Sequence, residues 1–151
     1  MGDSVRRKPP RRHSEEVVTV LAVGLDELDR NELRRIFDSS NWLLYEAKGC
    51  EDAGSFLREN PLGVIVCEYR TDRGCWHNLL DEVSNLEKPP LLVVTSRRAD
   101  DSLWAEVLNM GGYDVLAQPY DKSEVVRVLS LAWLHWKANL SQPQVLAAYA
   151  S

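Results

Sequence analysis

Several apolar segments of the sequence end in residues that can face a ligand. These residues are Gly24, Leu25, Asp26, Glu68, Thr95 and Gln118. They offer carboxylates, a hydroxyl, an amide and open backbone. In an open parallel sheet the carboxyl ends of the strands meet at one edge, where ligands gather. We therefore expect these residues to surround one site.

Other kinds of chemistry find little support in the sequence. His77 and His135 have no Ser or Cys partner at a recognisable spacing, so we expect solvated histidines and no catalytic nucleophile. Cys50, Cys67 and Cys75 lack the spacing of metal ligands and are predicted to be reduced thiols. The sequence thus predicts neither an enzyme nor a metal centre.

Five apolar, β-branched runs alternate with five amphipathic segments. The predicted strands are 17–23, 42–47, 64–67, 91–94 and 114–117, and the predicted helices are 26–39, 50–60, 75–86, 100–110 and 122–137. Strands that are apolar on both faces are typical of a parallel sheet covered by helices on each side. We predict one α/β domain, a doubly wound five-stranded parallel sheet in three layers. In its first helix, the expected buried stripe is Leu28, Leu33, Ile36 and Phe37.

The 151 residues divide unevenly in charge. Residues 1–14 carry five basic side chains against Asp3, a balance of +4, which leaves −9 for the rest from the total of −5. We predict a flexible basic arm at 1–14, a domain at 15–137 and a tail at 138–151. No apolar run approaches the roughly 20 residues of a membrane span. The first residues lack the apolar core of a secretory signal, so we expect a cytoplasmic protein without membrane association.

Three stretches together carry a family resemblance. They are Val64–Glu68, the turn Val94-Thr95-Ser96, and the run Gly111–Tyr120 with its glycine pair, acid and Gln118-Pro119. Their order and spacing resemble the CheY-like receiver domain of two-component response regulators, over about residues 17–136. The resemblance implies the flavodoxin-like fold and a role in phosphorelay signal transduction.

The resemblance also implies a magnesium pocket, from which this sequence departs. Receiver domains place two acidic residues after the first strand to help hold Mg²⁺. Here Gly24 and Leu25 stand in those places, and Asp26 follows as the third member of the loop. Because Mg²⁺ needs oxygen ligands in near-octahedral geometry, we expect its binding to be lost and predict no cofactor.

The positions that handle the phosphoryl group are altered too. Glu68 stands where the family has its phosphorylated aspartate, while Thr95 keeps the family's hydroxyl. Gln118 replaces the lysine before Pro119, and Val115 replaces the aromatic switch residue. The resemblance therefore indicates a degenerate receiver, or pseudo-receiver, that acts by binding a protein without aspartyl phosphorylation. Glu68 is either a built-in mimic that reaches toward Thr95 and Gln118, or a carboxylate hydrogen-bonded locally.

The last predicted helix has a wider apolar face than the sheet needs. Receivers commonly pair through their fourth helix, fifth strand and fifth helix. The interface candidates here are Trp104, Tyr113, Val126 and Trp133. Expected partners are a second copy, giving a homodimer, or a sensor kinase or output protein. Alternatively, the segment 139–151 folds back and covers this face.

The basic arm allows a different function, weak nucleic-acid association. Five cations on a flexible peptide can contact phosphates, but without groove-reading elements they give only salt-sensitive binding. The acidic body opposes such binding, so nucleic acid is not the expected partner.

Overall fold

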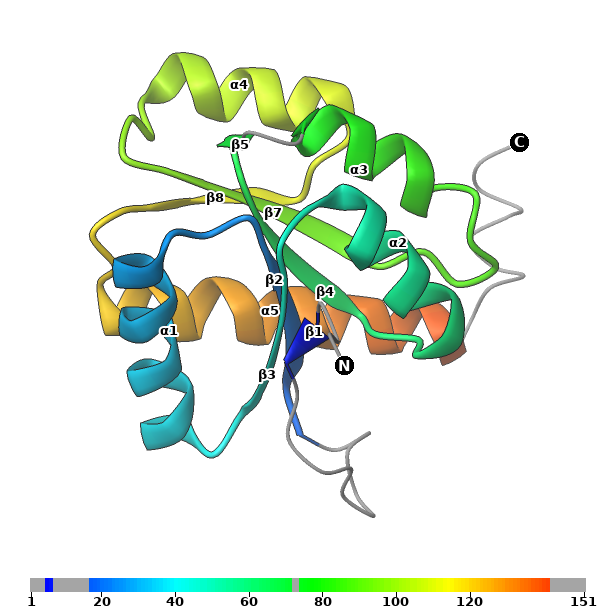
Figure 1. Ribbon diagram of the computed structural model, residues 1–151, viewed down its shortest axis with the longest axis horizontal. Coiled ribbons are helices and arrows are strands. Elements are labelled where there is room, and N and C mark those ends of the chain that lie inside the picture. The colour runs from blue at the N-terminus through cyan, green and yellow to red at the C-terminus, as the bar shows by residue number, and fades with distance from the viewer. Residues whose placement is uncertain (1–4, 7–16, 72–73, 142–151) are drawn as a thin grey trace.

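Alternating strands and helices build three layers in this computed structural model, which describes residues 5–6, 17–71 and 74–141 (Figure 1). The parallel strands are β2 (Thr19–Val23), β3 (Leu43–Ala47), β4 (Val64–Glu68), β7 (Leu91–Ser96) and β8 (Asp114–Ala117). They lie in the order β3-β2-β4-β7-β8. The predicted doubly wound α/β fold, of the flavodoxin type, is confirmed.

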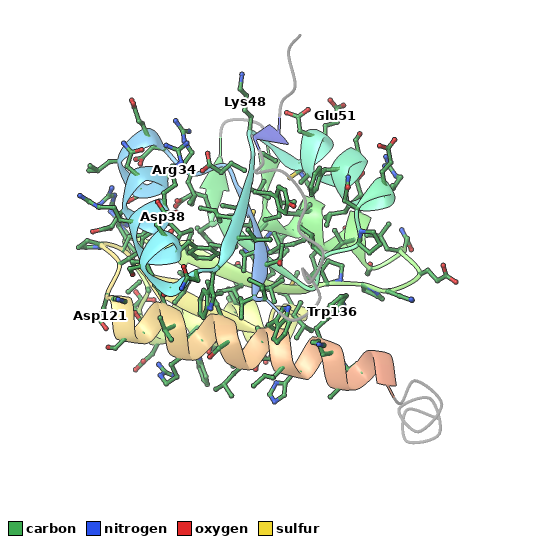
Figure 2. All side chains as sticks on the ribbon, turned by 90° about the horizontal axis from the view of Figure 1, so that it is seen from below. Arg34, Asp38, Lys48, Glu51, Asp121 and Trp136 are labelled. Carbon is green, nitrogen blue, oxygen red and sulfur yellow. The ribbon has the colours of Figure 1, made fainter. Side chains whose placement is uncertain are left out.

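Five helices cover the two faces of this sheet. They are α1 (Glu27–Ser40), α2 (Cys50–Glu59), α3 (Trp76–Val83), α4 (Asp101–Met110) and α5 (Lys122–Ser141). Side chains of α1 and α5 pack in one core cluster, and those of α2, α3 and α4 in another. Figure 2 shows α5 lying along one face, with Asp121 at its start and Trp136 toward its other end.

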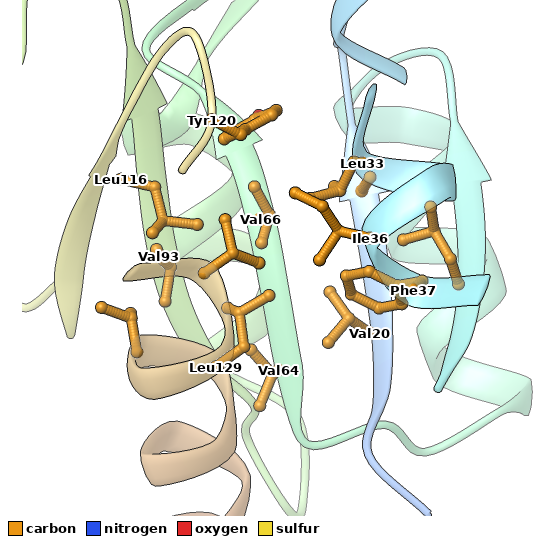
Figure 3. Packing of buried hydrophobic residues seen from close by; sticks show 14 of the residues in the cluster. Val20, Leu33, Ile36, Phe37, Val64, Val66, Val93, Leu116, Tyr120 and Leu129 are labelled. Atoms are coloured by element: carbon orange, nitrogen blue, oxygen red, sulfur yellow. The ribbon is translucent and has the colours of Figure 1, made fainter. Parts of the chain in front are cut away.

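The two core clusters meet back to back across the central strand. Val64 and Val66 of β4 point into the cluster shared with α1 and α5, shown in Figure 3. Ile65 and Cys67 point into the other cluster. All four are fully buried, which explains why this strand shows no polar alternation in the sequence.

Two helices begin at the carboxyl edge of the sheet with aspartate caps. Asp26 Oδ1 accepts the amide N–H of Asp29 at 2.9 Å, and Asp100 Oδ1 accepts that of Leu103 at 2.9 Å. Each bond satisfies an amide that has no partner within its helix. Gly111, with φ +109°, ends α4 in the left-handed conformation that glycine tolerates.

The structure differs from the predicted elements in several places. Within the predicted arm, Val5–Arg6 forms a short strand, β1, that pairs antiparallel with β3, although the composition of the arm predicts no packed element there. The rest of the arm lies outside the described residues. Arg70–Thr71 (β5) and Gly74–Cys75 (β6) pair within the predicted loop before α3. Helix α5 continues to Ser141, past the predicted domain boundary at 137.

The predicted buried stripe of α1 is wrong at one position. Leu28 is 68% exposed, whereas Asp29 is only 3% exposed. Asp29 lies four residues before Leu33 and therefore shares its helix face, whereas Leu28 is out of phase. The inward position of the first turn thus belongs to an acid.

Within the described ranges, no helix combines the length and apolar character required to cross a membrane.

Candidate functional site

A pocket of about 670 Å³ opens at the carboxyl edge of the sheet. It is lined by Gly24, Asp26, Asp29, Glu68, Tyr69, Ser96, Arg97, Arg98, Asp100, Ser102, Leu103, Glu106 and Gln118. Four of the predicted site residues, Gly24, Asp26, Glu68 and Gln118, are therefore brought together. The wall also contains acids and arginines that no sequence motif singled out.

Glu68, at the end of β4, is hydrogen-bonded within this pocket. Gln118 Nε2 donates to Glu68 Oε1 at 3.0 Å. Burial raises the pKa of Glu68, and the nearby carboxylates Asp29 and Asp26 add to the rise, against the opposing effect of the Gln118 bond. Of the two contacts expected for a phosphoryl mimic, the one to Gln118 is present. The Thr95 hydroxyl instead bonds to other groups.

Those groups form a buried hydrogen-bonded chain behind the pocket. Thr95 Oγ1 lies 3.1 Å from the carbonyl oxygen of Leu116 and 3.1 Å from Tyr120 Oη, and Gln118 Nε2 donates to Tyr120 Oη at 3.3 Å. A carbonyl can only accept, so the Thr95 hydrogen goes to Leu116 and Tyr120 donates to Thr95. Burial is the main reason why the pKa of Tyr120 is raised far above its ordinary value. The chain therefore links Glu68 to Thr95 through Gln118 and Tyr120.

One polar atom in this series of hydrogen bonds has no partner among the described residues. Gln118 is 6% exposed, and its Oε1 has no hydrogen-bond partner among the described residues. The side-chain amide instead bonds through Nε2, which donates to the Glu68 carboxylate and to the Tyr120 hydroxyl.

Arg97 brings a positive charge to the acidic wall of the pocket. Its Nη2 lies 3.3 Å from both carboxylate oxygens of Asp29 and 3.8 Å from Asp26 Oδ2. Burial raises the pKa of Asp29, and the neighbouring Asp26 raises it further. The Asp29 amide, which Asp26 caps, is the main reason why the pKa of Asp26 is lowered. The two acids and the guanidinium thus form one interacting group.

This set of donors does not fit a magnesium site of the receiver type. Leu25 is 5% exposed and packs in the core, so it offers no side-chain ligand. Asp26 Oδ1 already caps α1, and Asp29 faces Arg97. In the part of the chain that the structure describes, no three His, Cys, Asp or Glu side chains are grouped so that they could hold a metal. Mg²⁺ prefers several oxygen ligands in near-octahedral geometry.

Besides Leu25, three of the predicted positions lie outside the pocket wall. Thr95 is fully buried and reaches the pocket only through Tyr120 and Gln118. Val115 is 7% exposed and packs in the core cluster of α2, α3 and α4. Pro119 is exposed and follows a cis peptide bond with Gln118.

The interface candidates differ in exposure. Trp104 of α4 is 50% exposed, and its Nε1 donates to Asp114 Oδ1 at 3.2 Å. Tyr113, Val126 and Trp133 are partly buried and pack against the core cluster of α1 and α5. The most exposed apolar side chains on this side are therefore Trp104 together with Met110, Leu131 and Leu134.

Helices α4 and α5 border a second hollow. A groove of about 510 Å³ runs between α4 and α5 along β8, and Trp104 lines it together with Asp101 and Arg127. The two histidines are not buried, and each has a polar neighbour that is neither Ser nor Cys. His135 Nδ1 lies 2.6 Å from Tyr113 Oη, and His77 lies 3.5 Å from Glu106.

Three residues missed by sequence reasoning organise the site: Asp29, Arg97 and Tyr120. Asp29 could have been found, because it lies three residues after the cap Asp26 in the same helical turn. Tyr120 closes the Gly111–Tyr120 run, but one of its partners, Thr95, is 25 residues away and gives no local signal. Arg97 gives no local signal either, since its partner Asp29 is 68 residues away.

Several solved structures similar to this chain are receiver domains. The signal receiver domain of an HD domain-containing protein from Pseudomonas fluorescens Pf-5 is 19% identical, with a TM-score of 0.70 over 81% of this chain and 98% of that one. The beryllofluoride-activated NtrC4 receiver domain dimer is 18% identical, with a TM-score of 0.71 over 80% and 99% of the two chains.

A third neighbour is part of a complex. The receiver domain of the Saccharomyces cerevisiae response regulator Ssk1, solved with the phosphotransfer protein Ypd1, is 15% identical, with a TM-score of 0.67 over 76% of this chain and 87% of that one. No family model and no curated protein matches the sequence. At these identities the likeness establishes the fold, which is that of response-regulator receiver domains.

Proposed function

We propose that this protein is an atypical receiver domain in signal transduction, which acts by binding a protein and not through Mg²⁺-dependent aspartyl phosphorylation. The observation that carries the proposal is the bond of 3.0 Å from Gln118 to Glu68. It pairs a carboxylate with an amide at the two positions where the resembling family has its phosphorylated aspartate and its lysine.

Phosphoryl transfer in receiver domains depends on positive charge at the position of the family's lysine, which Gln118 does not supply here. Metal ions and lysine stabilise the oxygens of the transferring group in the transition state. The Gln118 amide is neutral, and its Nε2 is already shared between Glu68 and Tyr120. Glu68 is also one methylene longer than aspartate, which displaces its oxygens from the position of the usual nucleophile.

The Glu68 carboxylate then has a structural role: it helps to keep the domain in one conformation. Through Gln118 and Tyr120 it is connected to the buried Thr95 hydroxyl. This series of hydrogen bonds holds the ends of β4, β7 and β8 together in one arrangement. Output therefore depends on binding and on the amount of protein, and not on a covalent switch.

The surface for binding is proposed on α4, β8 and α5. Trp104 is exposed and lines the groove that contains Arg127. The same two helices carry three more exposed large apolar side chains, Met110, Leu131 and Leu134. Aromatic side chains and arginine are enriched at the centres of protein interfaces. Among the structural neighbours, one receiver domain is a dimer and another is bound to a phosphotransfer protein, which supports a partner of either kind.

The test is incubation with acetyl phosphate and Mg²⁺, followed by intact-mass measurement. We expect no added phosphoryl group, whereas a receiver domain with an aspartate at this position, treated in parallel, should gain one. A stoichiometric adduct that disappears in Glu68→Gln would contradict the proposal.

A further inference from the structure

We infer that Arg97 is the resident cation of the carboxylate pocket: its guanidinium neutralises Asp26 and Asp29 and thereby keeps divalent metal ions out. The inference rests on the proposed function in that it explains how the same pocket works without a metal. It concerns a residue that lies on the segment between β7 and α4, directly after the last residue of β7, Ser96.

The buried acid of the pocket needs a positive partner. The Asp29 side chain is 4% exposed, and a buried carboxylate is costly unless it is paired or protonated. Arg97 Nη2 is equidistant, at 3.3 Å, from both of its oxygens. Arg97 therefore supplies the positive charge that this buried carboxylate requires.

The same guanidinium also reaches the more exposed acid. Asp26 Oδ2 lies 3.8 Å from Arg97 Nη2, while Asp26 Oδ1 is occupied by the cap of α1. The side chain of Arg97 is 52% exposed, so the charge enters the pocket from its solvent side. The guanidinium therefore adds positive charge beside both carboxylates.

A tethered guanidinium differs from a metal ion in two ways. It is covalently attached to the protein, so its local concentration does not depend on the solution. It also joins two layers, because Asp29 belongs to α1 on one face and Arg97 leads into α4 on the other. A divalent ion at the same carboxylates would be repelled by this fixed positive charge.

Arg98 provides a matched control. It follows Arg97 directly and lines the same pocket. In residues 17–71 and 74–141, no ion pair joins it to Asp26 or Asp29, and its backbone N–H is bonded to Ser96 Oγ at 3.0 Å. Substituting Arg98 removes the same charge from the same loop and leaves the carboxylate contacts in place.

The test measures binding of Tb³⁺ by luminescence excited through nearby aromatic rings, since Tyr69 lines the pocket. The full chain is compared with Arg97→Gln, Arg97→Lys and Arg98→Gln, with circular dichroism as the check on folding. We expect Arg97→Gln to bind Tb³⁺ about tenfold or more tightly than the unmodified chain, with displacement by Ca²⁺ or Mg²⁺. Arg97→Lys and Arg98→Gln should behave like the unmodified chain.

Two further variants complete the design. Adding Asp29→Asn to Arg97→Gln should abolish the gained binding, which locates it in the pocket. Arg97→His, which is mostly neutral at about pH 8, should also gain binding there and serves if Arg97→Gln does not fold.

The outcomes separate the two proposals. Equal Tb³⁺ binding by Arg97→Gln, Arg97→His and Arg98→Gln would overturn the role of Arg97 and leave the proposed function standing. Saturable, Asp29-dependent binding of Mg²⁺ by the unmodified chain would count against both.

Discussion

Tyr120 places a hydroxyl group in the interior, where each polar atom requires a partner. It is 8% exposed, and its oxygen bonds to Thr95 Oγ1 and Gln118 Nε2. Replacement by phenylalanine leaves both partners without that bond. Tyr120→Phe should therefore lower the free energy of unfolding by about 1–3 kcal/mol, measured by urea denaturation.

Tyr69→Phe is the matched control for that substitution. The Tyr69 hydroxyl bonds to Glu106 at 3.1 Å on the pocket wall, where water can replace it. We expect a loss of less than about 0.5 kcal/mol. Equal losses of unfolding free energy in the two variants would show that the buried hydrogen bonds of Tyr120 stabilise the protein no more than the bond of Tyr69 on the pocket wall.

Glu68 should make stability depend on pH. Its pKa is raised above 4.5 mainly by burial, so the folded state holds this proton to a higher pH than the unfolded state does. The contribution of Glu68 to stability is then fullest at low pH, and it falls as pH rises from 4.5 through the raised pKa.

Glu68→Gln removes that titration and keeps an oxygen that can accept from Gln118. Its free energy of unfolding relative to the unmodified chain should therefore increase with pH. Thermal unfolding followed from acid to neutral pH checks this. A difference that shrinks as pH rises would show that Glu68 is stabilised in its charged form.

At the scale of elements, α5 makes a close approach to the start of β4 at Gly63. A Cβ atom added at Gly63 would overlap the indole ring of Trp136. Gly63→Ala should therefore destabilise the protein by about 1–3 kcal/mol, since the rigid ring has to move. Denaturation of Gly63→Ala in a Trp136→Leu background is the control, and there the cost of the alanine should largely vanish. An equal cost in both backgrounds would place its cause elsewhere.

Most elements were predictable because their side chains carry a periodic pattern. The apolar phase of Leu33, Ile36 and Phe37 identified most of the buried face of α1, and all three are buried. Pairing of β1 with β3 uses backbone groups of two residues and leaves no such pattern. Helix α5 continues past its predicted end at residue 137 because Ala138 and Asn139 carry no strong stop signal.

The site was predictable only where it follows from strand ends. Glu68 and Gln118 each end a strand or follow one, so the fold class alone brought them together. The partnership of Arg97 with Asp29 joins a loop to a helix across 68 residues. Neither residue type nor spacing reveals it, because it depends on how the first turn of α1 is rotated toward the pocket.

At the scale of the whole molecule, the exposed apolar side chains are unevenly distributed. Trp104, Leu131 and Leu134 are 50%, 44% and 54% exposed on α4 and α5, whereas Leu28 is 68% exposed on α1. If the proposed face binds a second copy, Trp104→Ala with Leu134→Ala should weaken self-association about tenfold or more. Sedimentation equilibrium at micromolar concentrations measures this.

Leu28→Ala is the control, because it removes a leucine of greater exposure from another helix. It should leave self-association unchanged. A mass of one chain at all concentrations would rule out the homodimer and leave a different protein as the partner.

The burial of β4 on both sides has a consequence for how the sheet is aligned. Val64, Ile65, Val66 and Cys67 are each 0% exposed. Sliding this strand by one residue would exchange side chains between the two cores without putting an apolar group into water. Hydrophobicity alone therefore says little about its register. That information is carried at the two ends of the strand, by Gly63, over which the Trp136 ring closes, and by Glu68, which meets Gln118 only in one alignment. Glu68 therefore also helps to fix the register of β4 in the sheet.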